Sequence, residues 1–262
     1  MQQKCKFLII PKLDELSESL ALAEEYGFGF EYNDFFIPDV MDDEKLTDEI
    51  VGRYKAQKLP EYCTMHGAFF DVLVFSRDKK IRKISEERVV TSLDIARKIG
   101  ARGVVFHTNY DPDLTSGSYI ESWLDINESF WRKVLPQYPD LEIYMENMFD
   151  RTPDMLCGMA KRLADIPNFG VCFDYAHAAV YGSDLDGWVD AVSPYTKHIH
   201  INDNDLENDL HLAVGDGKID WVHFKTCFEE KLSSAKTVLI ETSSIEDQRR
   251  SAEFLTKLGI LY

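Results

Sequence analysis

The chain has 262 residues, of which 45% are hydrophobic, and carries a formal net charge of −17 at pH 7. Its length suits one large domain, and its composition excludes disordered and fibrous classes. The acidic balance disfavours broad attraction to nucleic acid or an anionic membrane, although a bound metal cluster can reverse the field locally.

Short apolar segments alternate with longer amphipathic ones along the whole chain. The strand-like segments are apolar or β-branched inside, as expected of parallel strands covered on both faces. The helix-like segments carry an apolar stripe, and two of them stop at a glycine. The expected order is strand 6–10, helix 13–26, strand 28–32, helix 42–57, strand 62–66, helix 85–99, strand 103–107, helix 118–135, strand 141–146, helix 153–164, strand 169–174, helix 184–192, strand 197–201, helix 219–231, strand 237–241 and helix 246–258.

Eight strand-then-helix units without a linker predict an α/β fold, a (β/α)₈ TIM barrel formed as a single domain by residues 1–262. A doubly wound open sheet is the alternative, but it usually needs fewer strands. In a barrel of this kind the functional side chains lie at the carboxyl ends of the strands, so those positions were considered first.

Metal-competent side chains stand at six of these eight strand ends. Two further groups follow at short spacing, one three residues after strand 169–174 and one in the loop after strand 197–201. The candidates are His66, His107, Glu146, Asp174, His200 and Glu241 at the strands, with His177, Asp209 and His211 beyond them.

Each candidate taken alone fits a structural role, such as a hydrogen-bonded histidine or a helix-capping carboxylate. Taken together they do not, because so many carboxylates at one rim would repel one another unless a cation were present. His198 shares its strand face with His200 and is expected one layer deeper, as a packing or supporting residue.

The five cysteines contain no C-x-x-C pair, which suggests reduced thiols in a cytoplasmic protein. Cys172 is interpreted as a small core residue. No apolar run reaches the length needed to cross a bilayer, so no membrane segment is expected.

The motifs at these positions resemble the xylose isomerase-like barrel superfamily, which includes sugar and sugar-phosphate isomerases and epimerases and the endonuclease IV-type AP endonucleases (AP endonuclease family 2). The resemblance covers nearly the whole chain. Its pieces are M-H-G-A-F-F-D at 65–71, I-A-R-K-I-G-A-R-G-V-V-F-H at 95–107, Y-M-E-N at 144–147, F-D-Y-A-H at 173–177, H-I-N-D at 200–203, D-L-H-L-A-V-G-D-G-K-I-D-W at 209–221 and I-E-T at 240–242.

The resemblance implies roles for the candidate residues. Glu146, Asp174, His200 and Glu241 match a four-ligand metal site shared by the epimerase branch. Further metal ligands in the endonuclease branch, or substrate-binding groups in the isomerase branch, are matched by His66, His107, His177, Asp209 and His211. One nitrogen and three carboxylates suit Mn²⁺ at the shared site, with Zn²⁺, Mg²⁺ and Co²⁺ as alternatives.

Two functions remain open at this point. In the first, a metal-dependent isomerase or epimerase acts on a sugar, sugar phosphate or keto-polyol, and Glu146 and Glu241 are the catalytic pair that moves a proton through an enediolate. In the second, a multi-metal AP endonuclease hydrolyses a phosphodiester. The acidic loops at 34–44, 108–113 and 203–209 favour a small sugar-like partner over nucleic acid, and the sequence leaves the oligomeric state open.

Overall fold

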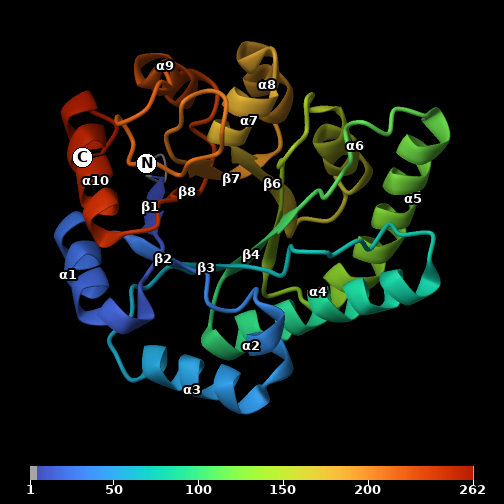
Figure 1. Cartoon of the computed structure of the whole chain (residues 1–262), viewed down its shortest axis with the longest axis horizontal. Coiled ribbons are helices and arrows are strands. Elements are labelled where there is room, and N and C mark those ends of the chain that lie inside the picture. The colour runs from blue at the N-terminus through green and yellow to red at the C-terminus, as the bar shows by residue number, and fades with distance from the viewer. Residues whose placement is uncertain (1–4, 262) are drawn as a thin grey trace.

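The structure is a computed structural model that describes residues 5–261. Eight parallel strands pair in chain order, and β8 closes the barrel by pairing with β1 (Figure 1). The predicted (β/α)₈ barrel is therefore confirmed. The strands are β1 Lys6–Ile9, β2 Gly29–Tyr32, β3 Cys63–His66, β4 Gly103–His107, β5 Glu142–Glu146, β6 Phe169–Asp174, β7 Thr196–Ile201 and β8 Thr237–Ile240.

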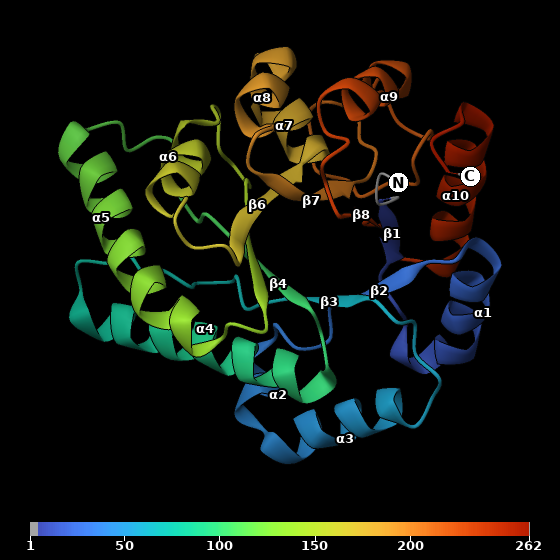
Figure 2. The same cartoon turned by 180° about the vertical axis from the view of Figure 1, so that it is seen from behind.

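Helices follow the strands and form the outer ring, as Figures 1 and 2 show from opposite sides. Two 3₁₀ turns, η1 Leu13–Glu15 and η2 Leu135–Gln137, join this ring. The helices are α1 Leu16–Tyr26, α2 Pro38–Asp42, α3 Glu44–Lys55, α4 Lys79–Ile99, α5 Gly117–Val134, α6 Asp154–Arg162, α7 Tyr175–Tyr181, α8 Leu185–Val192, α9 Trp221–Glu230 and α10 Ile245–Leu258.

The predicted strands agree with the structure to within one residue at each end. The helices differ more. Helix α4 begins at Lys79, six residues before the predicted start, and the short helices α2 and α7 were not predicted. Helix α7 is only seven residues long and begins directly after Asp174, whose side chain accepts a hydrogen bond from the backbone N–H of His177. So short a helix offers no recognisable apolar stripe.

The predicted glycine stops are present in the structure. Helix α1 ends at Gly27 with φ +68°, and α4 ends at Gly100 with φ +87°. Both values lie in the left-handed region, where a residue without a Cβ avoids a steric penalty. These turns let the chain leave each helix and enter the next strand after two or three residues.

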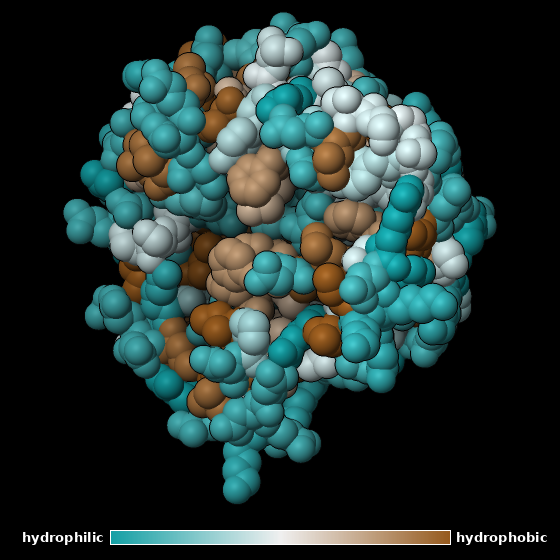
Figure 3. Space-filling view, turned by 45° about the vertical axis from the view of Figure 1, so that its right-hand side comes forward, coloured by the Kyte–Doolittle hydropathy of each residue, from teal (hydrophilic) through white to brown (hydrophobic). Residues whose placement is uncertain are grey.

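The large hydrophobic core lies between the sheet and the helices. A separate, smaller set of buried side chains occupies the inside of the barrel, and its apolar members include Leu8, Val105, Tyr144, Cys172 and Leu239. The predicted core role of Cys172 agrees with its complete burial. On the outer surface, hydrophobic side chains gather toward the middle of the face in Figure 3, within a mostly hydrophilic periphery.

Between residues 5 and 261, no helix combines the length and the apolar character that a membrane span requires.

Candidate metal centre

All nine candidate side chains meet at the carboxyl end of the barrel. Six come from the strands or the residue that follows, because parallel strands point their carboxyl ends to one rim. His177 comes from α7, and Asp209 and His211 come from the loop between β7 and α9. The donor atoms form three groups, and within each group they lie less than 4.8 Å apart. The groups are the central set Glu146, Asp174, His200 and Glu241; the strand set His66, His107 and Glu146; and the loop set His177, Asp209 and His211.

The central set is the most buried of the three. His200 Nδ1 lies 3.1 Å from Glu146 Oε1 and 3.4 Å from Glu241 Oε2. Asp174 completes the set from β6, which pairs directly with the strand that carries His200. One nitrogen and three carboxylate oxygens therefore converge on one point.

The strand set uses the other oxygen of Glu146. Glu146 Oε2 lies 3.2 Å from His107 Nε2 and 3.6 Å from His66 Nε2, and the two imidazole nitrogens are 3.3 Å apart. Glu146 thus belongs to two sets at once, with one carboxylate oxygen in each.

The loop set has similar dimensions. Asp209 Oδ2 lies 3.3 Å from His177 Nε2 and 3.1 Å from His211 Nε2. His211 adopts a positive φ of 48°, an uncommon backbone conformation for a side-chain-bearing residue. Such strain at a site is often maintained because it aims a functional side chain.

These separations are those of ligands around a metal ion. Zinc binds imidazole nitrogen and carboxylate oxygen at about 2.0–2.2 Å, so tetrahedral ligands lie roughly 3.3–3.6 Å from one another. The seven nitrogen–oxygen and nitrogen–nitrogen separations given above run from 3.1 to 3.6 Å.

Three of the imidazoles are fixed by backbone carbonyls at the nitrogen that faces away from their set. Nδ1 of His66 is 2.9 Å from the oxygen of Gly67, Nδ1 of His177 is 2.9 Å from that of Asn147, and Nδ1 of His211 is 3.1 Å from that of Glu241. A proton on each Nδ1 donates to the carbonyl and leaves Nε2 free. Metal-binding histidines are commonly oriented in this way.

Unpaired buried atoms provide a test of whether a cation fits. All four donor atoms of the central set are buried, and none has a hydrogen-bond partner among residues 5–261. The atoms are Glu146 Oε1, Asp174 Oδ2, His200 Nδ1 and Glu241 Oε2. Because buried polar atoms are otherwise almost always satisfied, the set fits a divalent cation.

The charges of the site also fit a cation. Burial, with the nearby Glu146 and Glu241 carboxylates, raises the pKa of Asp174 to about 7. Although burial opposes it, Glu241 and Asp209 raise the pKa of His211 to about 10. Without a metal, protons therefore balance the crowded carboxylates, and a divalent ion would displace those protons.

A cavity of about 500 Å³ opens above the three sets. Its wall is partly aromatic, and Lys12 is the single lysine or arginine among the described residues that line it. Glu241 is likewise the one glutamate of the lining, whereas Glu146 is fully buried beneath the histidines. The aromatic lining residues are Phe36, Phe69 and Phe70.

Sequence reasoning overlooked three buried polar residues that hold the site together. Asn147 pairs β5 with β6, Asp203 organises the loop that carries Asp209, and Glu31 lies inside the barrel. Glu31 had a sequence signal, since a glutamate stood between Phe30 and Tyr32 in an otherwise apolar strand. His198 was expected below His200, and the structure has it there, fully buried.

Comparisons with known proteins agree with this architecture. The chain is 27% identical over 222 residues to an uncharacterized protein of Methanocaldococcus jannaschii, covering 80% of this chain and 73% of the relative. It is 31% identical over 181 residues to a probable endonuclease 4 of Mycobacterium leprae, covering 63% and 67%.

Solved structures share the fold over nearly the full length. A Thermus thermophilus protein soaked with ZnCl₂ superposes with a TM-score of 0.76 at 23% identity, covering 98% of both chains. A D-tagatose 3-epimerase-like protein superposes with a TM-score of 0.75 at 24% identity, covering 97% of this chain and 96% of its own. The family model for xylose isomerase-like TIM barrels matches residues 20–258, and this chain belongs to that family.

Proposed function

We propose that the protein is a multi-metal hydrolase that cleaves a phosphate ester at the mouth of the barrel. The observation that carries this proposal is the position of Glu146, whose two carboxylate oxygens belong to two different donor sets. A shared carboxylate is the arrangement expected when neighbouring metal ions act as one unit. Divalent ions held there would activate water and stabilise negative charge on the phosphoryl oxygens.

The same position argues against Glu146 as a proton-transfer base. Its side chain is fully buried and is not among those that line the cavity, whereas that of Glu241 is. A base must come within hydrogen-bonding distance of the carbon-bound proton that it removes. We therefore assign Glu146 as a ligand, and we now rank phosphoester hydrolysis above the isomerase or epimerase chemistry that the sequence favoured.

Charge at the cavity floor supports an anionic substrate. Three divalent ions would bring six positive charges against the four carboxylates of the three sets. The floor would then be positive, although the protein as a whole carries −17. Lys12 at the rim can meet an additional anionic oxygen, and the phenyl rings of Phe36, Phe69 and Phe70 exclude water from one side.

The isomerase or epimerase reading remains the second candidate, because the cavity is small and partly apolar. A volume of about 500 Å³ with a single lysine suits a compact sugar or sugar phosphate. The solved structure named as a D-tagatose 3-epimerase-like protein, which shares this fold, is consistent with isomerase or epimerase activity. In this alternative the histidines of the strand and loop sets would contact substrate hydroxyls.

Two paired measurements separate the candidates. Metal content is measured in protein purified without added metal or chelator, and we expect up to three ions per chain, with Zn²⁺ favoured at the imidazole-rich sets. The same protein is then assayed on an abasic DNA duplex, on bis(p-nitrophenyl) phosphate, and for solvent-deuterium exchange into a panel of sugars.

We expect hydrolysis of at least one phosphoester, lost in Glu241→Gln and in His177→Ala. Cleavage of the DNA duplex would identify the endonuclease activity of the kind that its Mycobacterium leprae relative is named for. Deuterium exchange into a sugar by protein with one metal ion, without phosphoester cleavage, would overturn the proposal in favour of the second candidate.

A further inference from the structure

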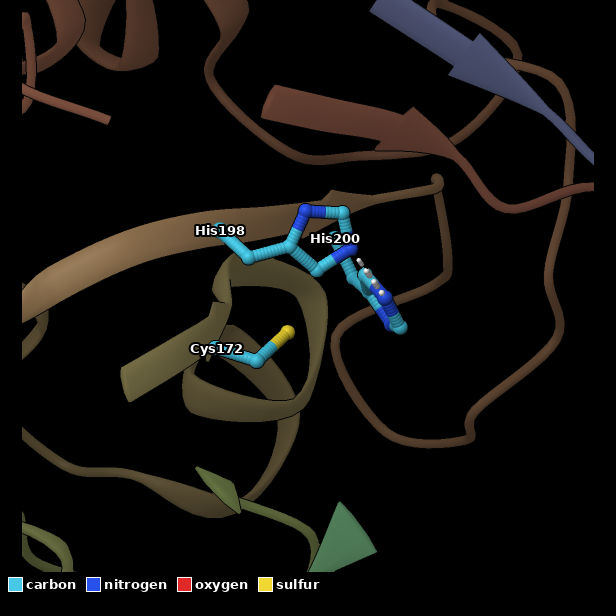
Figure 4. A group of neighbouring side chains, drawn as sticks. All are labelled: Cys172, His198 and His200. Atoms are coloured by element: carbon cyan, nitrogen blue, oxygen red, sulfur yellow. Dashed lines mark hydrogen bonds between the residues drawn. The ribbon is translucent and has the colours of Figure 1, made fainter. Parts of the chain in front are cut away.

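A layer of buried polar side chains lies directly beneath the central set. His198 and His200 project from the same strand toward the barrel interior, and Cys172 lies beside them on the neighbouring strand (Figure 4). Glu31 reaches this layer from β2, on the other side of the barrel. None of these side chains other than His200 belongs to the three donor sets, and all are fully buried.

The carboxylate of Glu31 lies against both imidazoles. Its Oε2 is 3.0 Å from His198 Nε2 and accepts a hydrogen bond from Thr64 Oγ1 at 2.7 Å. Its Oε1 is 3.2 Å from His200 Nε2 and has no hydrogen bond within residues 5–261. The two Nε2 atoms are themselves 3.0 Å apart (Figure 4).

These distances restrict where the ring protons can be. If His198 alone is protonated at Nε2, the His200 proton is at Nδ1 and blocks the donor atom of the central set. If His200 alone is protonated at Nε2, that N–H can donate to His198 Nε2 at 3.0 Å, but the lone pair of His198 Nε2 then also faces Oε2 of Glu31 at 3.0 Å, which is repulsive. When both rings are protonated at Nε2, each N–H has its own carboxylate oxygen.

The second and third arrangements both leave His200 Nδ1 free toward Glu146 and Glu241, and the third does so without the repulsion at Oε2 of Glu31. It also supplies a donor for the unpaired Oε1 of Glu31. His198 is compatible with it, because its Nδ1 lies 2.6 Å from Thr237 Oγ1, whose hydroxyl can donate to that nitrogen. His200 therefore differs from the three imidazoles that are fixed by backbone carbonyls.

The competing interpretation of this layer is that it holds an additional metal ion, bound by Cys172, His198 and His200. It would require both Nε2 atoms as donors, whereas each of them already lies within 3.2 Å of an oxygen of Glu31. It predicts that Cys172 matters for metal binding as much as Glu31 does. The two interpretations are therefore separable by mutation.

We propose that Glu31 is a positioning residue, which holds His200 in the Nε2–H tautomer and so presents Nδ1 to the metal of the central set. The inference rests on the proposed metal site, which it deepens by naming the group that prepares one of its ligands. Supporting carboxylates of this kind orient metal-binding histidines, and their loss typically weakens metal binding by about 10–100-fold.

The test begins with the wild-type protein. Apoprotein labelled with ¹⁵N-histidine is titrated with Zn²⁺, and the ring nitrogens are followed by NMR. We expect His200 in the loaded protein to show a protonated Nε2 and a metal-shifted Nδ1. A metal-bound Nε2 at His200 would overturn the proposal without any variant.

Variants then measure the contribution of Glu31. Zn²⁺ affinity is determined by competition with a chromophoric chelator for Glu31→Gln, Glu31→Asp and Cys172→Ala, with thermal unfolding followed in parallel. Glu31→Gln should weaken one ion by about 10–100-fold and leave the ions of the strand and loop sets unchanged. Glu31→Asp should recover part of the loss, and Cys172→Ala should bind as the wild type does.

The outcomes distinguish failure of the proposed function from failure of the proposed role of Glu31. Wild-type protein that binds no ion at the central set would reject the proposed function itself. Wild-type binding with unchanged affinity in Glu31→Gln would reject the role of Glu31 alone, as would an equal loss in Cys172→Ala. If Glu31→Gln fails to fold, the His200 tautomer measured in the wild-type protein and the Zn²⁺ affinity of Glu31→Asp still test the role of Glu31.

Discussion

Asn147 completes the pairing of β5 and β6 with its side chain, at the point where the backbone of β5 turns away. Its Nδ2 donates to the carbonyl oxygen of Asp174 at 2.8 Å, and its Oδ1 accepts from the backbone N–H of Asp174 at 3.0 Å. The side-chain amide thus imitates one more step of the sheet and fixes the backbone of a central-set carboxylate.

Replacing this amide should therefore affect both stability and metal binding. Asn147→Ala leaves the buried N–H and C=O of Asp174 unpaired, at a cost of about 1–3 kcal/mol for each group, and lets Asp174 move. We expect a lower free energy of unfolding in urea, together with weaker Zn²⁺ binding.

Asn168 offers a matched control at the other end of the barrel, where its Nδ2 donates to the carbonyl oxygens of Tyr138 and Leu141. Asn168→Ala should lower stability without changing metal affinity. Equal effects of the two variants on metal binding would show that the amide at 147 acts only through general stability.

The sharing of Glu146 predicts an unequal pattern of metal loss. Glu146→Gln removes an anionic donor from the central set and from the strand set, whereas Asp174→Asn alters the central set alone. At a fixed free Zn²⁺ concentration, Glu146→Gln should lose up to two ions per chain and Asp174→Asn one. Elemental analysis of the two variants measures this, and equal losses would contradict a bridging position for Glu146.

The buried carboxylate of Asp203 holds the loop that carries two members of the loop set. Its Oδ1 accepts from the backbone N–H groups of Asn204 and Ile219, and its Oδ2 accepts from Gly215 N–H and Trp221 Nε1–H. We expect Asp203→Ala to lower the free energy of unfolding by roughly 2–5 kcal/mol, because several buried donors lose their acceptor.

The same variant should lose the metal of the loop set and retain the other ions. Asp205→Ala is the control, since Asp205 accepts hydrogen bonds only from nearby residues of the same exposed loop, Glu207 and Asn208, within the described chain. Retention of three ions by Asp203→Ala would show that metal binding by the loop set does not depend on Asp203.

Titration of the buried Asp150 carboxyl group should make the stability of the protein depend on pH without involving a metal ligand. Burial raises the pKa of this side chain to about 6, against its hydrogen bonds from Thr108 and Met148. A carboxyl group whose pKa is higher in the folded state binds protons more tightly there, so its contribution is complete below about pH 4 and is lost as the pH rises through about 6.

Wild-type protein should therefore lose stability between about pH 4 and pH 6 relative to Asp150→Asn, which cannot titrate at this position. Urea unfolding of both proteins at several pH values measures the difference. A constant difference across this range would mean that Asp150 has an ordinary pKa in the folded protein.

The strands, and the meeting of the nine candidate side chains at one rim, could be predicted because both follow from local pattern. Parallel strands buried on two faces are continuous apolar runs, and His66 or Glu241 at the end of such a run stands out. The grouping into three sets could not be derived in the same way, because it depends on where α7 and the loop after β7 place His177 and Asp209. The role of Glu31 was also hidden, since it contacts His198, which is 167 positions away in sequence.

The pairing of β1 with β8, which closes the barrel, affects the order in which the site can form during synthesis. β1 and β8 pair in register, and the buried side chain of Gln248 donates from its Nε2 to the carbonyl oxygen of Ile10 at 2.7 Å. This contact joins positions 238 residues apart, so it forms only after residue 248 has left the ribosome. A nascent chain that already displays Glu146, Asp174 and His200 still lacks Glu241, so the central set is incomplete until β8 is made. A divalent ion that needs all four donors of the central set could therefore bind only after the last strand has closed the barrel.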